Sequence, residues 1–180
     1  SPMIGGPEPF GIGRDMFRYV VHKDPNWDWR KFDLASDLAA ADKQYRDTQN
    51  AEDVDLRAFR RNGGRLLLWH GLGDPLVPPQ GTVDYYKSAV EKVGQKDFIK
   101  LFLMPGVQHC GGGEGPNSFD VVTALEQWVE HGKAPDQIIA SHSTDGRVDR
   151  TRPLCPYPQT AQYKGTGSID AAANFACKMP

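Results

Sequence analysis

The fold is decided by a short apolar run, RLLLWH at residues 65–70, and by the loop GLGDPLVPP at residues 71–79 that follows it. A continuous apolar run of this length, next to glycines, is typical of a strand covered on both faces. A second run of the same kind, FIKLFLM at residues 98–104, leads into a proline and a glycine. Between them, Thr82 can cap a helix whose apolar residues recur every three or four positions up to Gly94. The sequence therefore predicts a strand, a helix and a second strand.

Further helices are predicted on both sides of this unit. The segment DVDLRAFRRNGG, residues 53–64, places apolar side chains at helical spacing and ends in two glycines. After the second strand, Asn117 can cap a helix that carries Val122, Leu125 and Val129 on one face before a glycine stops it. The order helix, strand, helix, strand, helix predicts the α/β class, with a parallel sheet and right-handed crossovers.

The flanking segments carry weaker signals. Residues 1–50 predict an arm, or the end of a lid region, that leads into the core and contains a short helix at residues 36–42. Residues 51–140 form the predicted core of strands and helices. At the end of this core, the segment IIASH at residues 138–142 is long enough only for an edge strand or a connection. The Pro- and Gly-rich residues 141–180 predict an irregular tail.

Composition excludes several classes of protein. The 180 residues are 39% hydrophobic and 24% charged, which is typical of a folded globular chain. The formal net charge is −2, and the basic residues are scattered along the chain, so the sequence argues against a nucleic-acid partner. A membrane span needs roughly 18 consecutive apolar residues, and no stretch approaches that length. We expect a small-molecule substrate, with neither nucleic acid nor membrane as a partner.

Two ionisable residues stand about four positions beyond the two predicted strands. Asp74 follows the first strand and His109 follows the second, 35 positions further along the chain. Because parallel strands joined by one crossover end at the same edge of a sheet, the two side chains can meet there. A carboxylate that orients an imidazole is the supporting half of a Ser-His-Asp triad, with the histidine as general base. The sequence contains no Gly-x-Ser-x-Gly elbow, so the nucleophile is missing from these residues.

Asp74 and His109 also have simpler, non-catalytic interpretations. Asp74 precedes a proline, and Asp-Pro favours a turn whatever the chemistry. His109 can be a hydrogen-bonded structural histidine, or a metal ligand together with Glu114 or His142, although no second ligand stands at a recognised metal spacing. The meeting of two loops at one sheet edge favours catalysis for both residues. His70, at the end of a buried strand, is interpreted as a packing or supporting residue without a direct role.

A run of three glycines, residues 111–113, follows closely after His109. A phosphate-binding loop would need a following Lys-Ser/Thr and the start of a helix, and neither is present. The run instead predicts a close approach of the backbone beside the histidine.

The chain has three cysteines. Cys155 and Cys177 lie 22 positions apart in a tail with few apolar residues, and a disulfide between them would offset the ordering entropy of that tail by roughly 3 kcal/mol. Two buried free thiols are the alternative. Cys110 stands directly after His109, and in an oxidising compartment it lacks a partner within these residues.

Four segments together carry a family resemblance. They are WHGLGDPLVPP (69–79), FLMPGVQHCGGGEGP (102–116), ALEQWVEHGKAPDQIIAS (124–141) and RTRPLCPYPQTAQYKGTGSIDAAANFAC (150–177), and the pair Tyr85-Tyr86 accompanies them. In these segments the sequence closely resembles the C-terminal part of the tannase and feruloyl esterase family, with HCGGG and RPLCPYPQ as its most specific pieces. The resemblance covers roughly residues 14–177.

The resemblance implies the C-terminal portion of an α/β-hydrolase fold in a secreted or periplasmic serine esterase. Members act on phenolic acid esters such as feruloyl or galloyl esters, and a relative cleaves a terephthalate monoester. The family's acid and base match Asp74 and His109, and its cysteine after the histidine, here Cys110, pairs with a cysteine directly before the nucleophilic serine. The resemblance places that serine, the oxyanion hole and most or all of the lid before the matched segment, so we expect an N-terminal segment or a second chain to supply them.

Two further expectations concern ligands. Calcium, where the family binds it, belongs to the lid region and is not encoded in these residues, so no cofactor is expected for this chain. From a different class of function, the chain can be a non-catalytic lobe that binds phenolic ligands or stabilises a partner.

Overall fold

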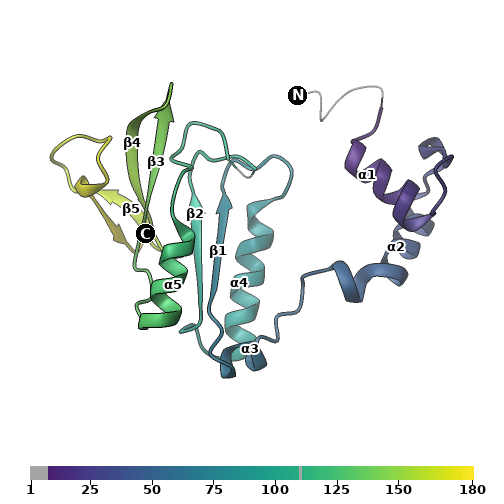
Figure 1. Cartoon of the computed structure of the whole chain (residues 1–180), viewed down its shortest axis with the longest axis horizontal. Helices are drawn as coiled ribbons and strands as arrows, with labels where there is room; N and C mark the ends of the chain where they lie inside the picture. Colours follow the sequence, from purple (N-terminus) through teal and green to yellow (C-terminus); the bar gives the residue numbers. More distant parts are fainter. Residues whose placement is uncertain (1–7, 110) are drawn as a thin grey trace. The chain divides into compact units, whose positions relative to one another are not determined.

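The computed structural model describes residues 8–109 and 111–180, and the chain divides into two compact units, Ser1–Asp53 and Val54–Pro180 (Figure 1). The helical segments of the first unit are α1 (Gly11–Asp15), a π-helical turn (Met16–Val21), a 3-10 turn (Trp29–Lys31) and α2 (Leu34–Gln49). The Asp33 carboxylate caps α2 by accepting a hydrogen bond from the Ser36 amide at 2.8 Å. The predicted helix at residues 36–42 was therefore too short, because the cap lies further upstream and polar residues dominate the remaining turns.

Side chains of the first unit hold its turns against α2. His22 and Asp37 form a contact of 3.0 Å between a ring nitrogen and a carboxylate oxygen, and the Asp37 side chain is largely buried. The Tyr45 hydroxyl donates to the Val20 carbonyl at 2.9 Å. Phe17 packs edge-on against Phe32 at 4.8 Å between ring centroids. Aromatic and polar contacts together therefore stabilise this small unit.

The core of the second unit is a parallel pair of strands. Strand β1 (Leu66–Gly71) pairs with β2 (Ile99–Met104) from Leu66 opposite Ile99 to Gly71 opposite Met104. The helices of this unit are α3 (Arg57–Arg61), α4 (Pro79–Val93) and α5 (Val121–His131). The predicted order of helix, strand, helix, strand and helix is confirmed.

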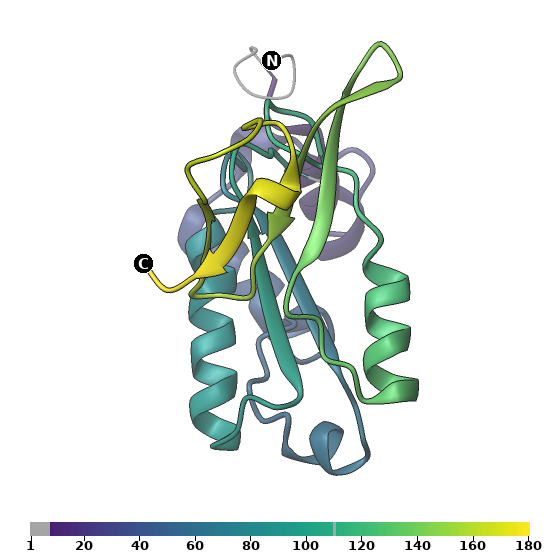
Figure 2. The same ribbon diagram turned by 90° about the vertical axis from the view of Figure 1, so that its left-hand side faces the viewer.

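Helices α4 and α5 flank the strand pair on opposite sides (Figures 1 and 2). Alternate strand residues face each helix, as a pleated strand requires. Toward α4, Ile99 and Leu101 are fully buried against Tyr86, and toward α5, Phe102 packs in one buried cluster with Trp128. Strand β2 is thus covered on both faces, as its continuous apolar sequence predicts, whereas β1 is covered only in part, since Trp69 is 47% exposed.

Two predicted helix starts were wrong. Helix α4 begins at Pro79, so Thr82 lies in its first turn and is not its cap. Helix α5 begins after Asp120, whose carboxylate accepts from the Thr123 amide at 2.9 Å, so Asn117 lies outside the helix. Pro78 precedes α4 without a side-chain capping hydrogen bond, whereas the Asp120 side chain caps α5. The predicted apolar face of α5 also differs, because Trp128 is buried while two valines predicted to face the core are exposed, Val122 and Val129.

The last forty residues are not an irregular tail, as the sequence had suggested. Strand β3 (Ile138–Thr144) and strand β4 (Arg147–Leu154) form an antiparallel hairpin, turned by Asp145 and Gly146 with positive φ. Strand β5 (Thr160–Tyr163) pairs antiparallel with β6 (Phe175–Lys178) after a 3-10 turn at Ala172–Asn174. The edge strand allowed at residues 138–142 is part of β3, whereas β4, β5 and β6 were not predicted, since β4 is mostly polar and β5 and β6 have only four residues each.

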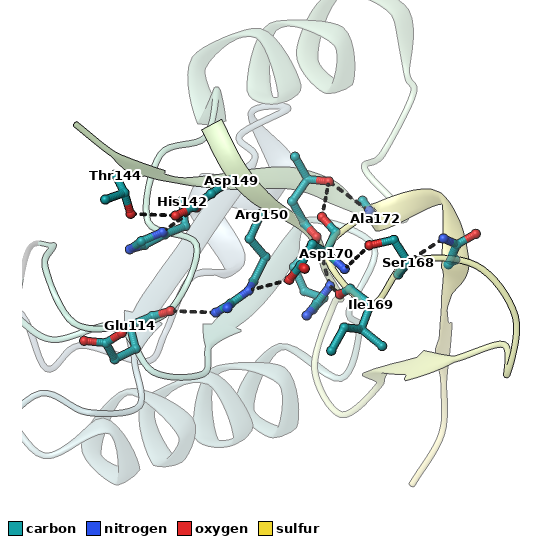
Figure 3. A network of polar contacts seen from close by, with 12 residues as sticks. Glu114, His142, Thr144, Asp149, Arg150, Ser168, Ile169, Asp170 and Ala172 are labelled. Carbon is teal, nitrogen blue, oxygen red and sulfur yellow. Dashed lines mark hydrogen bonds and ion pairs between the residues drawn. The ribbon is translucent and has the colours of Figure 1, made fainter. Parts of the chain in front are cut away.

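Covalent and polar links hold this tail in place. A disulfide joins Cys155 and Cys177, the pair expected from the sequence, with their Cα atoms 5.5 Å apart. The Arg150 side chain donates to Asp170 and to the Glu114 carbonyl, both at 3.1 Å, and so connects β4 with the segments before β6 and after β2 (Figure 3). The glycine-rich loop that contains His109 is therefore anchored to the tail at its far end.

Candidate active site

The loops that follow β1 and β2 are joined backbone to backbone. The Leu72 amide donates to the Met104 carbonyl, and the Gly73 amide donates to the Val107 carbonyl, both at 2.9 Å. A Cβ atom on Gly71 would collide with the carbonyl oxygens of this second loop, so glycine is required at the close approach. The carboxyl ends of two parallel strands thus bring the two loops to one edge of the sheet, as predicted.

This arrangement brings Asp74 and His109 into contact. The Nδ1 atom of His109 lies 2.8 Å from Oδ2 of Asp74. The other carboxylate oxygen, Oδ1, accepts from the amides of Leu76 at 2.8 Å and Val77 at 3.0 Å. The Asp74 side chain is only 4% exposed, whereas that of His109 is 42% exposed. A buried, fixed carboxylate therefore supports an imidazole that is open to solvent.

Electrostatics favour the ionised form of Asp74. Burial by itself raises the pKa of this carboxyl, but the Val77 amide, the His109 ring and the Leu76 amide outweigh it and hold the pKa well below its usual range. A carboxylate can only accept hydrogen bonds, so Nδ1 of the neutral His109 ring carries the proton and Nε2 has a free lone pair. An imidazole in this tautomer can accept a proton at Nε2, which is the role of a general base.

The glycine run beside His109 has the backbone role predicted for it. Gly112 and Gly113 have φ values of 71° and 82°, in the region that favours glycine. The Gln108 amide donates to the Gly112 carbonyl at 3.2 Å, and a Cβ atom on Gly113 would collide with the Gly106 carbonyl. The run folds back tightly on the segment after β2, which sets the position of His109.

Other residues singled out in the sequence have separate places. His70 lies behind Asp74, with Nδ1 at 2.7 Å from the Thr82 hydroxyl, so Thr82 supports this histidine rather than capping a helix. Nothing in the sequence pattern predicted that contact. His142 lies on β3 and pairs with Asp149. Cys110 is outside the described residues.

The described part of the chain carries neither a metal cluster nor a membrane-spanning helix. Residues 8–109 and 111–180 contain no group of three or more histidine, cysteine, aspartate or glutamate side chains placed to hold a metal ion. Within the same residues, none of the helices combines the length and the apolar character that crossing a membrane requires.

A cavity of about 730 Å³ lies elsewhere in the second unit, between the segment after β2 and the tail. Its lining includes Leu103, Arg150, Leu154 and Tyr157, and neither Asp74 nor His109 is among the lining residues. The candidate catalytic groups are therefore the hydrogen-bonded Asp74 and His109, which lie outside this cavity.

Comparisons with known proteins agree with the sequence resemblance. A model of the family described as tannase and feruloyl esterase matches residues 11–178. Mono(2-hydroxyethyl) terephthalate hydrolase from Piscinibacter sakaiensis is 49% identical over 138 residues, covering 74% of this chain and 23% of that protein. A probable feruloyl esterase B-2 from Aspergillus terreus is 33% identical over 199 residues, covering 98% of this chain and 38% of that protein.

Solved structures of esterases are also similar to this chain. The crystal structure of an esterase from Aspergillus oryzae superposes with a TM-score of 0.81 at 34% identity, covering 95% of this chain and 38% of the other. The curated relatives are much longer than the matched region, since this chain covers 23% of one and 38% of the other.

Proposed function

The chain belongs to the tannase and feruloyl esterase family, and from this premise we propose that the complete protein is a serine carboxylic ester hydrolase. In this proposal the chain supplies the Asp and His of a Ser-His-Asp triad. The observation that carries it is the contact of 2.8 Å between His109 Nδ1 and the buried Asp74 carboxylate at the carboxyl ends of β1 and β2. The same proposal makes these strands the C-terminal part of an α/β-hydrolase sheet, which the superposition on an esterase structure supports.

The geometry assigns a role to each group. His109 Nε2 takes the proton of the serine hydroxyl as the serine oxygen bonds to the ester carbonyl carbon, and Asp74 stabilises the imidazolium that forms. His109 then gives the proton to the leaving alkoxide as the ester C–O bond breaks, which releases the alcohol and leaves an acyl-enzyme. A water molecule attacks the acyl carbon with His109 again as the base, which releases the acid and the serine. Asp74 stays ionised throughout, in keeping with its lowered pKa.

The missing nucleophile belongs to a segment or partner chain outside these residues. We place the serine there, with a cysteine before it that forms a disulfide with Cys110, and the oxyanion hole with it. Such a bond would hold the serine loop at the distance from His109 that proton transfer needs. A structural disulfide of this kind suits an exported protein, so secretion or a periplasmic location is part of the proposal.

Phenolic acid esters are the proposed substrates. Feruloyl or galloyl esters are supported by the feruloyl esterase relatives, which match 98% of the chain. A terephthalate monoester is the second candidate, supported by 49% identity to the hydrolase of mono(2-hydroxyethyl) terephthalate. The candidates share an aromatic acyl group and differ in its polar substituents and, for feruloyl esters, in the double bond between the ring and the carbonyl.

A substrate panel tests the proposal. The complete protein is assayed with methyl ferulate, methyl gallate and mono(2-hydroxyethyl) terephthalate, beside its His109→Ala and His142→Ala variants. We expect hydrolysis of at least one ester, its loss in His109→Ala, and retention in His142→Ala. Absence of hydrolysis with all three esters, together with binding of the free phenolic acids, would instead support a non-catalytic binding lobe.

A further inference from the structure

A second histidine lies next to the proposed catalytic carboxylate. His70 is the penultimate residue of β1, four positions before Asp74, and its side chain is 12% exposed. Its Nε2 atom is 3.1 Å from the Val77 carbonyl oxygen and 3.3 Å from Asp74 Oδ2. Oδ2 is also the oxygen that receives the ring of His109. The Asp74 carboxylate therefore lies between two imidazoles.

The neighbours of His70 determine where its proton is. The Val77 carbonyl and the Asp74 carboxylate both can only accept, so the ring nitrogen facing them, Nε2, carries a hydrogen. In the neutral ring, Nδ1 then accepts the hydroxyl proton of Thr82 on α4. His70 thus connects β1, the turn after it and the first turn of α4 through a single ring.

Val77 closes this arrangement. Its amide donates to Oδ1 of Asp74, and its carbonyl accepts from His70, whose Nε2–H also points toward the Oδ2 side of the same carboxylate. Hydrogen bonds at both the amide and the carbonyl of Val77 fix the turn, and they leave the Asp74 carboxylate little freedom to rotate. The catalytic cost of such freedom is large, because a misplacement of about 1 Å can lower a rate by about 10².

We propose that His70 is a positioning residue that holds Asp74 toward His109 through Val77 and Thr82. This inference rests on the proposed function for its kinetic consequence, but its structural part concerns the Asp74–His109 hydrogen bond alone. Purely structural packing by His70 would contribute to stability without affecting that bond. The two roles are therefore separable by experiment.

The test uses the complete protein with three changes. His70→Leu keeps most of the volume and removes the donor, His70→Gln keeps an N–H donor near the position of Nε2, and Thr82→Val removes the anchor at Nδ1. We expect His70→Leu to lower kcat by about 10- to 100-fold with little change in KM. His70→Gln should restore most of that loss, and Thr82→Val should have a smaller effect of the same kind.

A second readout is independent of turnover. The Nδ1 proton of His109, held by a carboxylate, gives a downfield NMR signal, which we expect to weaken or shift in His70→Leu and to return in His70→Gln. The matched control is His142→Leu, which removes a histidine from another carboxylate in the same unit and should leave the signal unchanged.

The outcomes separate the hypotheses. An unchanged His109 signal in a folded His70→Leu protein would overturn the positioning role, whatever happens to activity. Should His70→Leu fail to fold, the signal in Thr82→Val and His70→Gln decides, and a wild-type signal in Thr82→Val overturns the role. Absence of ester hydrolysis in the wild type would refute the proposed function while leaving the NMR test of His70 intact.

Discussion

Two aspartate–histidine pairs in the second unit have nearly the same nitrogen–oxygen distance but the opposite pattern of side-chain burial. His109 and Asp74 approach to 2.8 Å, and His142 and Asp149 approach to 2.6 Å. In the first pair the acid is 4% exposed and the histidine 42%, whereas in the second the acid is 44% exposed and the histidine 20%. Distance therefore does not distinguish the pairs. The pairs differ in which residue is buried. In the first pair it is the acid, which leaves the histidine ring open to a substrate, as a general base requires.

The pairs also differ in how the chain makes them. His109 and Asp74 are 35 positions apart, on loops that follow two parallel strands. His142 and Asp149 are seven positions apart on the β3–β4 hairpin, beside a register shift that follows the His142–Arg150 pair, and Thr144 also donates to Asp149 at 2.6 Å. The short hairpin keeps these two residues close in space because they are close in the chain. Contact between distant loops requires the whole fold, and it is the contact that carries the proposed chemistry.

Replacing the acid of each pair is the strongest test of this contrast. Asp74→Asn in the complete protein should reduce kcat by up to about 10⁴, because the amide no longer selects the His109 tautomer that can accept a proton. Asp149→Asn should leave kcat near the wild-type value. Steady-state kinetics on the best ester substrate, with circular dichroism to verify folding, measure both. An Asp74→Asn protein that keeps more than about a tenth of wild-type kcat would remove this residue from the mechanism.

Much of the first pair could be predicted from the sequence. Two continuous apolar runs and the helix between them were sufficient to predict parallel strands, and parallel strands joined by one crossover end at the same edge. That rule placed Asp74 beside His109. It could not show that Leu76 and Val77 would hold the other carboxylate oxygen, because that depends on the turn geometry.

The second pair and its surroundings were not predicted. Strands β4, β5 and β6 were interpreted as an irregular tail, because β4 is mostly polar and β5 and β6 have only four residues each. Thr82 was assigned to a helix cap, although its hydroxyl instead contacts His70. Local patterns cannot reveal such side-chain contacts, since they depend on how β1 packs against α4.

Removing the disulfide should affect the second pair before the first. Strand β4, which carries Asp149, leads directly into Cys155, while Asp74 and His109 follow β1 and β2. A Cys155→Ser/Cys177→Ser protein should lose roughly 3 kcal/mol of stability, the effect of opening a loop of this size. Urea unfolding measures the loss, and hydrogen exchange should rise in the tail strands, including β4 with Asp149, before it rises in β1 and β2. Faster exchange in β1 and β2 with an unchanged tail would contradict this order.

Two glycines separate loop positioning from general stability. Alanine at Gly71 would push its Cβ against the Val107 and Gln108 carbonyls and move the loop of His109, so we expect kcat to fall by about 10². Gly81 lies in α4 with open space around it, and Gly81→Ala should stabilise the protein by about 0.5–1 kcal/mol without affecting kcat. Kinetics and thermal unfolding of both variants test the difference. Equal kcat in the two variants would mean that the close approach at Gly71 does not position the base.

The smallest expected difference between the pairs is their dependence on acid pH. Hydrogen bonds from the Thr144 hydroxyl and the His142 ring lower the pKa of Asp149, and the pKa of Asp74 is lowered despite its burial. A carboxyl with a lowered folded-state pKa stabilises the fold above its unfolded pKa of about 3.9, and this contribution is lost as the pH falls through the folded value. The free energy of unfolding of the wild type should therefore decrease below about pH 4.

Each Asp→Asn variant should flatten part of that decrease, and Asp74→Asn should flatten more of it, because two amides and a ring act on Asp74 while Asp149 is nearly half exposed. Urea unfolding between pH 2 and pH 6 measures the slopes. If the free energy of unfolding depended on pH equally in the two variants, Asp74 and Asp149 would stabilise the fold equally. Burial of the carboxylate would then not distinguish the pairs energetically.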